Sequence, residues 1–366
     1  MIRVCAGNPY AWLARYRGQK PLIVCVLSFT ETGLIPGISA AGKTPQARHY
    51  TALADGEFLL RRQQGYSHIR GDSQYALPPL KAGISPALIS RAILTQQALP
   101  CCLLSTGLPG QLAVPHIALP TVMARSLTTG LAMTHHQVNQ LWDSGLHWGY
   151  QLARTYADSY LVLGECVVGG TTTAQALLTA LGYEVGGQVS SSHPSGNHPQ
   201  KQALVRQGLS IWQQRPHLNS AFTAVAALGD PMQVVAAAIA ITASKTTGVL
   251  LAGGAQMLAV YALVKAICNA IGEPVSPKIV VGTTRWVIED KHADTVAIAR
   301  AVGAPYLASE LNFSQSPYAQ LQAYERGFVK EGMAAGGCAI AASLHQGWGP
   351  SRIRQAVEIE LRRWLY

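Results

Sequence analysis

The sequence predicts an α/β protein in which a mainly parallel sheet is covered by helices on both faces, giving three Rossmann-like layers. Short apolar or β-branched runs alternate with helical stretches, which is the pattern of βαβ units. Apolar residues make up 49% of the 366 residues and charged residues 13%. This composition is typical of a sheet buried on both faces, and the chain is long enough to enclose a large core.

Five short runs have the composition of buried parallel strands, and turn residues follow each of them. These runs are Leu22–Leu27, Cys101–Leu104, Tyr160–Leu163, Gly248–Leu251 and Ile279–Val281. Residues 248–271 are apolar enough to suggest a membrane span, but Gly253, Gly254 and Lys265 interrupt them. We therefore interpret this stretch as a buried strand followed by a helix. The apolar residues expected along that helix are Met257, Val260, Val264, Ile267 and Ile271.

The two ends of the chain are expected to lie together. We predict an α/β core over residues 20–325, with residues 1–19 and 326–366 forming a smaller helical subdomain that completes the site. The pattern of residues 351–366 predicts an amphipathic helix, with Ile353, Val357 and Leu361 on the face that docks onto the core.

A net charge of +10 favours anionic partners: nucleic acid, a membrane surface or phosphorylated small molecules. The basic clusters, Arg61-Arg62 and the C-terminal arginines, lack the interleaved aromatic residues of a strand-binding groove. We therefore expect small anionic substrates, with no nucleic acid and no membrane span. Seven cysteines without a CxxC pair, and no apolar leader, predict reduced thiols and a cytoplasmic protein.

Loops rich in Gly, Ser and Thr follow the predicted strands. Because the carboxyl ends of parallel strands meet at one edge of a sheet, such loops can combine backbone N–H groups into an anion site. The loops are 164–173, 190–197, 229–230, 253–254 and 282–284.

Two of these loops are the best candidates for holding a phosphate. In the first, glycines allow close backbone approach, and a threonine run opens the helix predicted over 174–181, whose dipole contributes roughly 0.3–1 kcal/mol. In the second, three serines precede a lysine. The candidates are Gly169, Gly170, Thr171, Thr172, Thr173, Ser190, Ser191, Ser192 and Lys201. A capped structural turn and a solvated loop are the alternative interpretations.

Residues 37–44 match the GxxxxGK[ST] pattern of a nucleotide-binding P-loop. The predicted strand ends at Leu27, well before Gly37, and Pro36 and Pro45 bracket the motif. An ATP or GTP hydrolase or kinase is therefore kept only as an alternative. The close histidine pairs lack a carboxylate at ligand spacing, so we expect no metal site, and no cofactor.

The segment GECVVGGTTTAQALLTALGY (164–183) resembles the signature loop and helix of the nicotinate-nucleotide:dimethylbenzimidazole phosphoribosyltransferases, in their archaeal and cyanobacterial branch. Blocks at 30–59, 229–233, 250–263 and 324–337 agree with the same branch, in the same order along the chain. The resemblance implies a phosphoribosyltransferase that acts on nicotinate mononucleotide and a heterocyclic base, and it implies a homodimer. The product would be an α-ribazole-type 5′-phosphate for the nucleotide loop of cobamides.

Matching the motifs of this family residue by residue implies several roles. Glu331 falls on the general base and Glu165 on a second acid, while Ser190–Ser192 and Lys201 fall on a phosphate loop. The resemblance places Ser39 and Gln46 in the base pocket. Asp230 is a further candidate that a turn would explain equally well.

The sequence departs from the bacterial pattern at Val167-Val168 and at Ala334-Ala335. Dimethylbenzimidazole, adenine and a phenol all remain open as the accepted base. A non-catalytic nucleotide-binding relative remains a further alternative.

Overall fold

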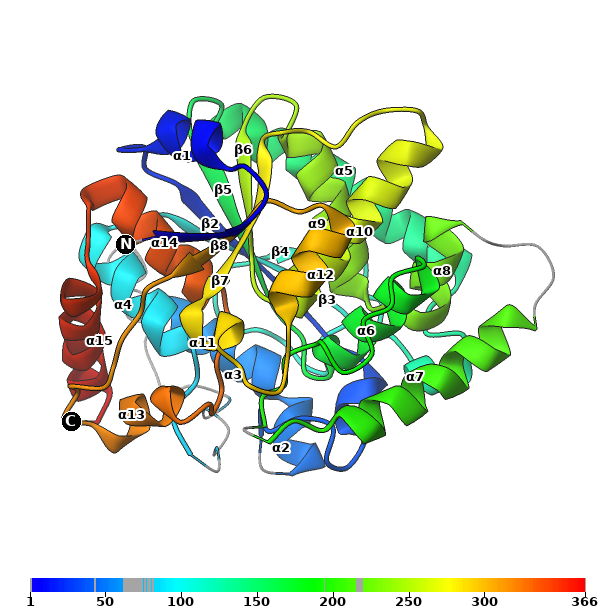
Figure 1. The fold of residues 1–366 in the computed structure, drawn as a ribbon, viewed down its shortest axis with the longest axis horizontal. Coiled ribbons are helices and arrows are strands. Elements are labelled where there is room, and N and C mark those ends of the chain that lie inside the picture. Colours follow the sequence, from blue (N-terminus) through cyan, green and yellow to red (C-terminus); the bar gives the residue numbers. More distant parts are fainter. Residues whose placement is uncertain are drawn as a thin grey trace.

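The computed structural model describes residues 2–42, 44–61, 75, 77, 80, 82–193, 195–214 and 220–365. These residues form an eight-stranded sheet in the order β1-β8-β7-β6-β5-β2-β3-β4 (Figure 1). The strands are β1 (Ile2–Ala6), β2 (Leu22–Ser28), β3 (Cys101–Thr106), β4 (Ile117–Ala118), β5 (Tyr160–Cys166), β6 (Gly248–Ala252), β7 (Ile279–Thr284) and β8 (Tyr306–Ser309). Every neighbouring pair is parallel except β1 with β8.

Helices cover both faces of this sheet, so the predicted three-layer α/β fold is confirmed (Figure 1). One face carries α5 (His135–Thr155), α6 (Gly170–Ala180), α7 (His198–Gln213), α8 (Ala221–Leu228), α9 (Pro231–Ala243), α10 (Ala255–Ala270) and α12 (Thr295–Val302). The other carries α1 (Tyr10–Tyr16), α3 (Thr51–Leu60), α4 (Ala87–Gln97), α14 (Ala335–Gln346) and α15 (Pro350–Leu365). Shorter elements connect them: η1 (Glu31–Leu34), α2 (Pro45–His49), η2 (Leu127–Thr129), α11 (Arg285–Ile288) and α13 (Ala319–Glu325).

All five strands expected from the sequence are present, as β2, β3, β5, β6 and β7. The stretch 248–271 forms the expected strand and helix, β6 and α10, and both are buried in the sheet and its covering layer. Within the described ranges, no helix has both the length and the apolarity that crossing a bilayer would need.

The chain ends lie together on one side of the sheet, but not entirely as helices. Residues 2–6 form β1, an antiparallel edge strand of the main sheet, which corrects the expectation of a helical segment there. Helix α14 packs on β5, β6, β7 and β8, and α15 packs on α4. Ile353, Val357 and Leu361 are buried in that contact, as the amphipathic pattern predicted. The division of the chain at residue 325 stays a prediction.

The strand order contains a reversal that fixes where a ligand can bind. From β2 the chain runs outward through β3 and β4, and it then returns to place β5 on the other side of β2. The loops after β2 and β5 therefore leave in opposite directions and open a crevice at the carboxyl edge. In open parallel sheets, this switch point is the usual position of the ligand.

Close helix packing behind this crevice depends on two glycines of α5. A side-chain carbon added to Gly145 would lie 2.6 Å from Ala238 Cβ, and one added to Gly149 would lie 2.9 Å from Ile239 Cα in α9. Interiors are packed to nearly crystalline density, so an added methyl group there forces the two helices apart.

We expect Gly149→Ala to lower the free energy of unfolding by about 1–3 kcal/mol, because overpacking outweighs the roughly 1 kcal/mol that alanine adds in helix propensity. Denaturant unfolding would measure the change. Gly349→Ala is the control, since no atom of the described residues lies within 4 Å of the added carbon. That variant should stay within about 0.5 kcal/mol of the wild type. Equal stability of the two variants would contradict close packing of α5 on α9.

Candidate active site

A pocket opens at the switch point and encloses about 1230 Å³ between atoms, part of it open to solvent. Its walls come from the loops after β2, β5 and β6, from α3 and the segment before α4, from the loop before α7, and from the segment that precedes α14. The predicted site residues that line it are Ser39, Glu165, Gly169, Gly170, Thr171, Ser190, Ser191, Ser192 and Glu331. The structure therefore brings both predicted carboxylates and both predicted phosphate loops to one cavity.

Glu165 lies at the end of β5 and is 4% exposed. One carboxylate oxygen accepts a hydrogen bond from Val167 N (3.0 Å), and the other accepts one from Gln256 Nε2 (3.0 Å). Burial raises the pKa of Glu165 to about 8, and the nearby carboxylates of Asp230 and Glu331 contribute to that rise. At neutral pH this carboxyl can therefore carry a proton in the free enzyme.

The loop after β5 makes a tight turn into α6. Gly169 has φ +88°, and a side-chain carbon there would lie 2.7 Å from Gly33 N, so this position requires glycine. Gly169, Gly170 and Thr171 face the pocket at the first turn of α6. The helix begins at Gly170, four residues before the start expected from the sequence, so the threonines lie inside the first turn.

Thr172 and Thr173 do not line the pocket, which differs from the predicted phosphate contacts. Both side chains are fully buried in α6, and Thr173 Oγ1 donates to Asp230 Oδ2 at 2.6 Å. Asp230 also caps α9 through Gln233 N, and burial raises its pKa to about 6. Asp230 lies outside the pocket lining, and its contacts are those of the turn residue that was the alternative interpretation.

The serine loop is held in place by two buried lysines. Lys201 is fully buried, does not line the pocket, and donates to Ser190 O at 3.0 Å. Lys330 donates to Ser191 O at 2.9 Å and pairs with Asp290 at 2.6 Å. Desolvation, followed by repulsion from Lys330, lowers the pKa of Lys201 to about 7. Lys201 therefore shapes the loop from behind, which corrects the expectation that it touches the phosphate directly.

Ser39 reaches the pocket through contact with this serine loop. Its Oγ lies 3.2 Å from Ser192 Oγ, which also accepts from Ala40 N at 2.8 Å. Gln46 is exposed on α2 and does not line the pocket, so the structure does not place it beside the base as the resemblance implied. A role for Gln46 in binding the base therefore stays a prediction.

The P-loop pattern at 37–44 lies in a different structural context from a nucleotide-binding P-loop. Between Ser28, where β2 ends, and Gly37 lies the short helix η1. Thr44 caps α2, which has only five residues, and Lys43 lies outside the described residues. A phosphate-binding helix that follows its strand directly is not formed by the part of this motif that the structure describes.

Four donors converge on the carboxylate of Glu331. Thr283 Oγ1 (2.8 Å) and Thr284 N (2.9 Å) donate to one oxygen, and Gly332 N (3.2 Å) and Gly336 N (3.0 Å) donate to the other. Burial raises the pKa of Glu331 above its ordinary value, and these four hydrogen bonds oppose the rise. The carboxylate is thus fixed in orientation at the pocket wall.

The segment that carries Glu331 has an unusual backbone. Val329, Lys330, Met333 and Ala334 all have positive φ, between 50° and 70°, which costs of order 1–3 kcal/mol for each residue that is not glycine. Hydrogen bonds oppose this strain: Met333 N donates to Glu165 O (3.0 Å) and Thr284 Oγ1 donates to Lys330 O (2.6 Å). Such strain persists only where the surroundings fix the backbone, and it clusters at functional sites.

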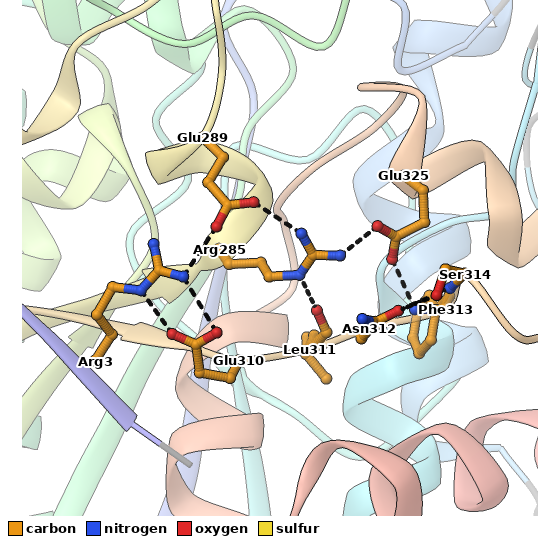
Figure 2. A network of polar contacts seen from close by, with 9 residues as sticks. All are labelled: Arg3, Arg285, Glu289, Glu310, Leu311, Asn312, Phe313, Ser314 and Glu325. Carbon is orange, nitrogen blue, oxygen red and sulfur yellow. Dashed lines mark hydrogen bonds and ion pairs between the residues drawn. The ribbon is translucent and has the colours of Figure 1, made fainter.

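A charged network braces the start of this segment (Figure 2). Arg285 directly follows the threonines that bind Glu331, and its guanidinium pairs with Glu325, the last residue of α13. Glu325 also accepts from Phe313 N at 2.6 Å. Figure 2 shows the network continuing through Glu289 to Arg3 on β1. The segment after α13 is therefore anchored to β7 and β8.

Several pocket residues were not singled out from the sequence. Asp55 on α3 lines the pocket, as do Gln256 at the start of α10 and Lys330 beside Glu331. Asp55 and Gln256 lie within the two blocks 30–59 and 250–263 that carry the family resemblance, so position in those blocks was the available signal. Among the described residues, no group of three His, Cys, Asp or Glu side chains is arranged to hold a metal ion.

Known proteins resemble this chain in sequence over most of its length. A family model described as phosphoribosyltransferase matches residues 114–275. The UPF0284 protein of Acaryochloris marina is 52% identical over 349 residues, covering 95% of this chain and 93% of that protein. The UPF0284 protein of Rippkaea orientalis is 51% identical over 351 residues, covering 95% and 94%.

Two solved structures have a similar fold. CobT from Thermus thermophilus superposes with a TM-score of 0.60 at 17% sequence identity, covering 96% of this chain and 87% of that one. A nicotinate-nucleotide-dimethylbenzimidazole phosphoribosyltransferase structure from the same organism gives 0.55 at 16% identity, covering 95% and 84%. At these identities the likeness establishes the fold.

The raised pKa of Glu165 predicts a pH-dependent effect of Glu165→Gln on stability. The group favours the folded state fully below pH 4.5, its ordinary pKa, and that contribution is lost as pH rises through about 8. Glutamine removes this titration and can donate to Gln256 Oε1, which has no hydrogen-bond partner among the described residues. We expect the melting temperature of the variant to rise relative to the wild type between pH 5 and pH 8. A difference that stays constant across that range would contradict the shifted pKa.

Proposed function

Because this chain belongs to the UPF0284 family and matches a phosphoribosyltransferase family model over residues 114–275, we propose that it transfers phosphoribose from nicotinate mononucleotide to a heterocyclic base. The observation that carries the proposal is the position of Glu331, which lines the same pocket as the two glycine- and serine-rich loops. The product would be an α-ribazole-type 5′-phosphate, used in the nucleotide loop of a cobamide, with nicotinate released.

The phosphate end of the substrate is assigned to the wall made by Gly169–Thr171 and Ser190–Ser192. This wall offers backbone N–H groups at the start of α6 and four hydroxyls. Lys330 and Lys201 add positive charge beneath the serine loop, and they are fixed by carbonyl groups of that loop. In the free protein the hydroxyls of Ser190 and Ser191 donate to Asp290 and Asn197, so a dianionic phosphate would take these donors over from side-chain acceptors.

The chemistry then needs one proton acceptor. A ring nitrogen of the base attacks the anomeric carbon, the bond to nicotinate breaks, and its electron pair neutralises the positive nicotinate ring nitrogen. The other ring nitrogen of the base must lose its proton, and Glu331 is the carboxylate assigned to accept it, in exchange for one of its four present hydrogen bonds. Holding base and sugar in line supplies much of the remaining acceleration.

Glu165 is assigned a second role in the same pocket. Its raised pKa makes it a hydrogen-bond donor when protonated, and its partner Gln256 fixes its orientation. A neutral carboxyl suits a ribose hydroxyl, because a second full negative charge beside Glu331 would be unfavourable.

The direct experiment is incubation of the protein with nicotinate mononucleotide and a mixture of azole and purine bases, followed by mass spectrometry for a new nucleotide. We expect an α-nucleotide and free nicotinate in equal amounts. Binding of nicotinate mononucleotide without transfer to any base would identify a non-catalytic relative. Thermal stabilisation by Mg-ATP alone would favour the P-loop alternative.

Glu331→Gln should reduce kcat by about 10²–10⁴-fold while nucleotide binding is retained, because the proton acceptor is lost and the phosphate wall is not. The amide group would face one of the two pairs of N–H and O–H donors, so some loss of stability is expected as well. Steady-state kinetics with calorimetry of nicotinate mononucleotide binding, below the melting temperature of the variant, separates the two effects. Unchanged kcat would remove Glu331 from the mechanism.

A further inference from the structure

Asp55 is a carboxylate in the pocket that the proposed reaction does not use. It is 5% exposed, its Oδ1 accepts from Ser85 Oγ at 2.6 Å, and its Oδ2 accepts from the Cys166 thiol at 3.6 Å. Among the described residues, no Lys, Arg or His forms an ion pair or hydrogen bond with it. A carboxylate can accept about four hydrogen bonds, so this one has unused acceptor capacity that opens into the cavity.

A buried carboxylate without a cation is costly unless something compensates for its lost hydration. Desolvation raises the pKa of Asp55 to about 6, and the Ser85 hydroxyl opposes that rise. Its environment therefore favours a donor that arrives with the substrate. Asp230 also has a pKa raised to about 6, but the Thr173 hydroxyl and a helix-capping bond from Gln233 N satisfy it, and it does not line the pocket.

The neighbours of Asp55 place it near the segment that carries Glu331. The Ser85–Pro86 segment lies against the segment that carries Glu331, because a carbon added to Gly332 would lie 3.4 Å from Pro86 Cγ. The Tyr324 hydroxyl also donates to Ile84 O at 2.7 Å. Apolar wall residues surround this part of the pocket. They include Leu80, Ala82, Pro86, Phe328 and Val329.

The two ends of the pocket come from opposite faces of the sheet. The phosphate wall belongs to α6 and the loop before α7, whereas Asp55 belongs to α3 on the other face (Figure 1). A nucleotide anchored by its phosphate at the α6 side therefore leaves the α3 side to the incoming ring. That ring would lie between apolar side chains with a carboxylate at its edge.

We propose that Asp55 determines which base is accepted, by binding an amino or hydroxyl donor on the edge of the heterocycle remote from the attacking nitrogen. This inference rests on the proposed function and adds the chemical class of its base. A base that carries only methyl groups on that edge would leave the carboxylate desolvated and without a donor, which a polar site discriminates against strongly.

The test compares two bases of nearly equal shape, 5-aminobenzimidazole and 5-methylbenzimidazole, each with nicotinate mononucleotide. For the wild type we expect kcat/KM to be about 10–100-fold higher with the amino compound, the range of one hydrogen bond to a charged group. Asp55→Ala should bring the ratio close to one, mainly by raising KM for the amino compound. Asp55→Asn, which keeps the shape and one acceptor, should give an intermediate ratio.

Glu57→Gln is the matched control, because Glu57 is a fully buried carboxylate on the same helix that does not line the pocket. It should keep the wild-type ratio between the two bases. Melting curves establish that each variant is folded at the assay temperature, and binding of nicotinate mononucleotide should be the same in all of them.

Calorimetric binding of each base to the wild type and to Asp55→Ala is measured in parallel. Equal affinities for the two bases in the wild type, or a preference unchanged by Asp55→Ala, would overturn the role of Asp55. Transfer to both bases with equal kcat/KM would do the same while leaving the proposed function intact. Absence of transfer to any base, with the amino preference still present in binding, would overturn only the proposed function.

Discussion

The site depends on one backbone hydrogen bond, from Met333 N to the carbonyl oxygen of Glu165. This bond ties the end of the central strand β5 to the segment that carries Glu331, and so fixes two carboxylates from distant parts of the chain in one cavity. Without it, Met333 and Ala334 would have little reason to hold left-handed backbone angles. The same contact therefore holds the strained backbone of that segment in place and positions the proposed general base, Glu331.

The balance of charge in the pocket follows from this arrangement. Glu165, Glu331 and Asp55 all line one cavity, and burial raises the pKa of each. The two buried lysines are turned toward loop carbonyls and Asp290, so they do not neutralise these three acids directly. The acidic and cationic regions therefore stay separate, which suits a substrate with a phosphate at one end and a ring with N–H donors at the other.

Much of the fold could be predicted because parallel strands buried on both faces leave a continuous apolar signal. The strands that the sequence pattern did not predict, β1, β4 and β8, are edge or very short strands, and β8 has only four residues. Tertiary contacts decide how these strands pair, and the local sequence pattern does not reveal such contacts.

The candidate site could be predicted where glycine and hydroxyl residues determine the backbone geometry, as at Gly169 and Ser190–Ser192. It was not predictable for helical side chains. Gln46 and Asp55 both lie on helices after β2, and only the packing of α3 over the sheet decides which of them reaches the cavity. Thr172, Thr173 and Lys201 were placed in the right segments, but the helical turn directs them into the interior.

The edge strand β1 also constrains how the protein is made. It pairs with β8, and Arg3 donates a hydrogen bond to Glu310, which lies 307 residues later in the sequence. During synthesis, residues 2–6 must wait, unpaired, until residues 306–309 have been made. Closure of so long a loop is slow, and β8, once formed, has a free edge until β1 pairs with it. Completion of the sheet, and with it the brace on the Glu331 segment, is therefore expected to be a late event in biogenesis, open to assistance by chaperones.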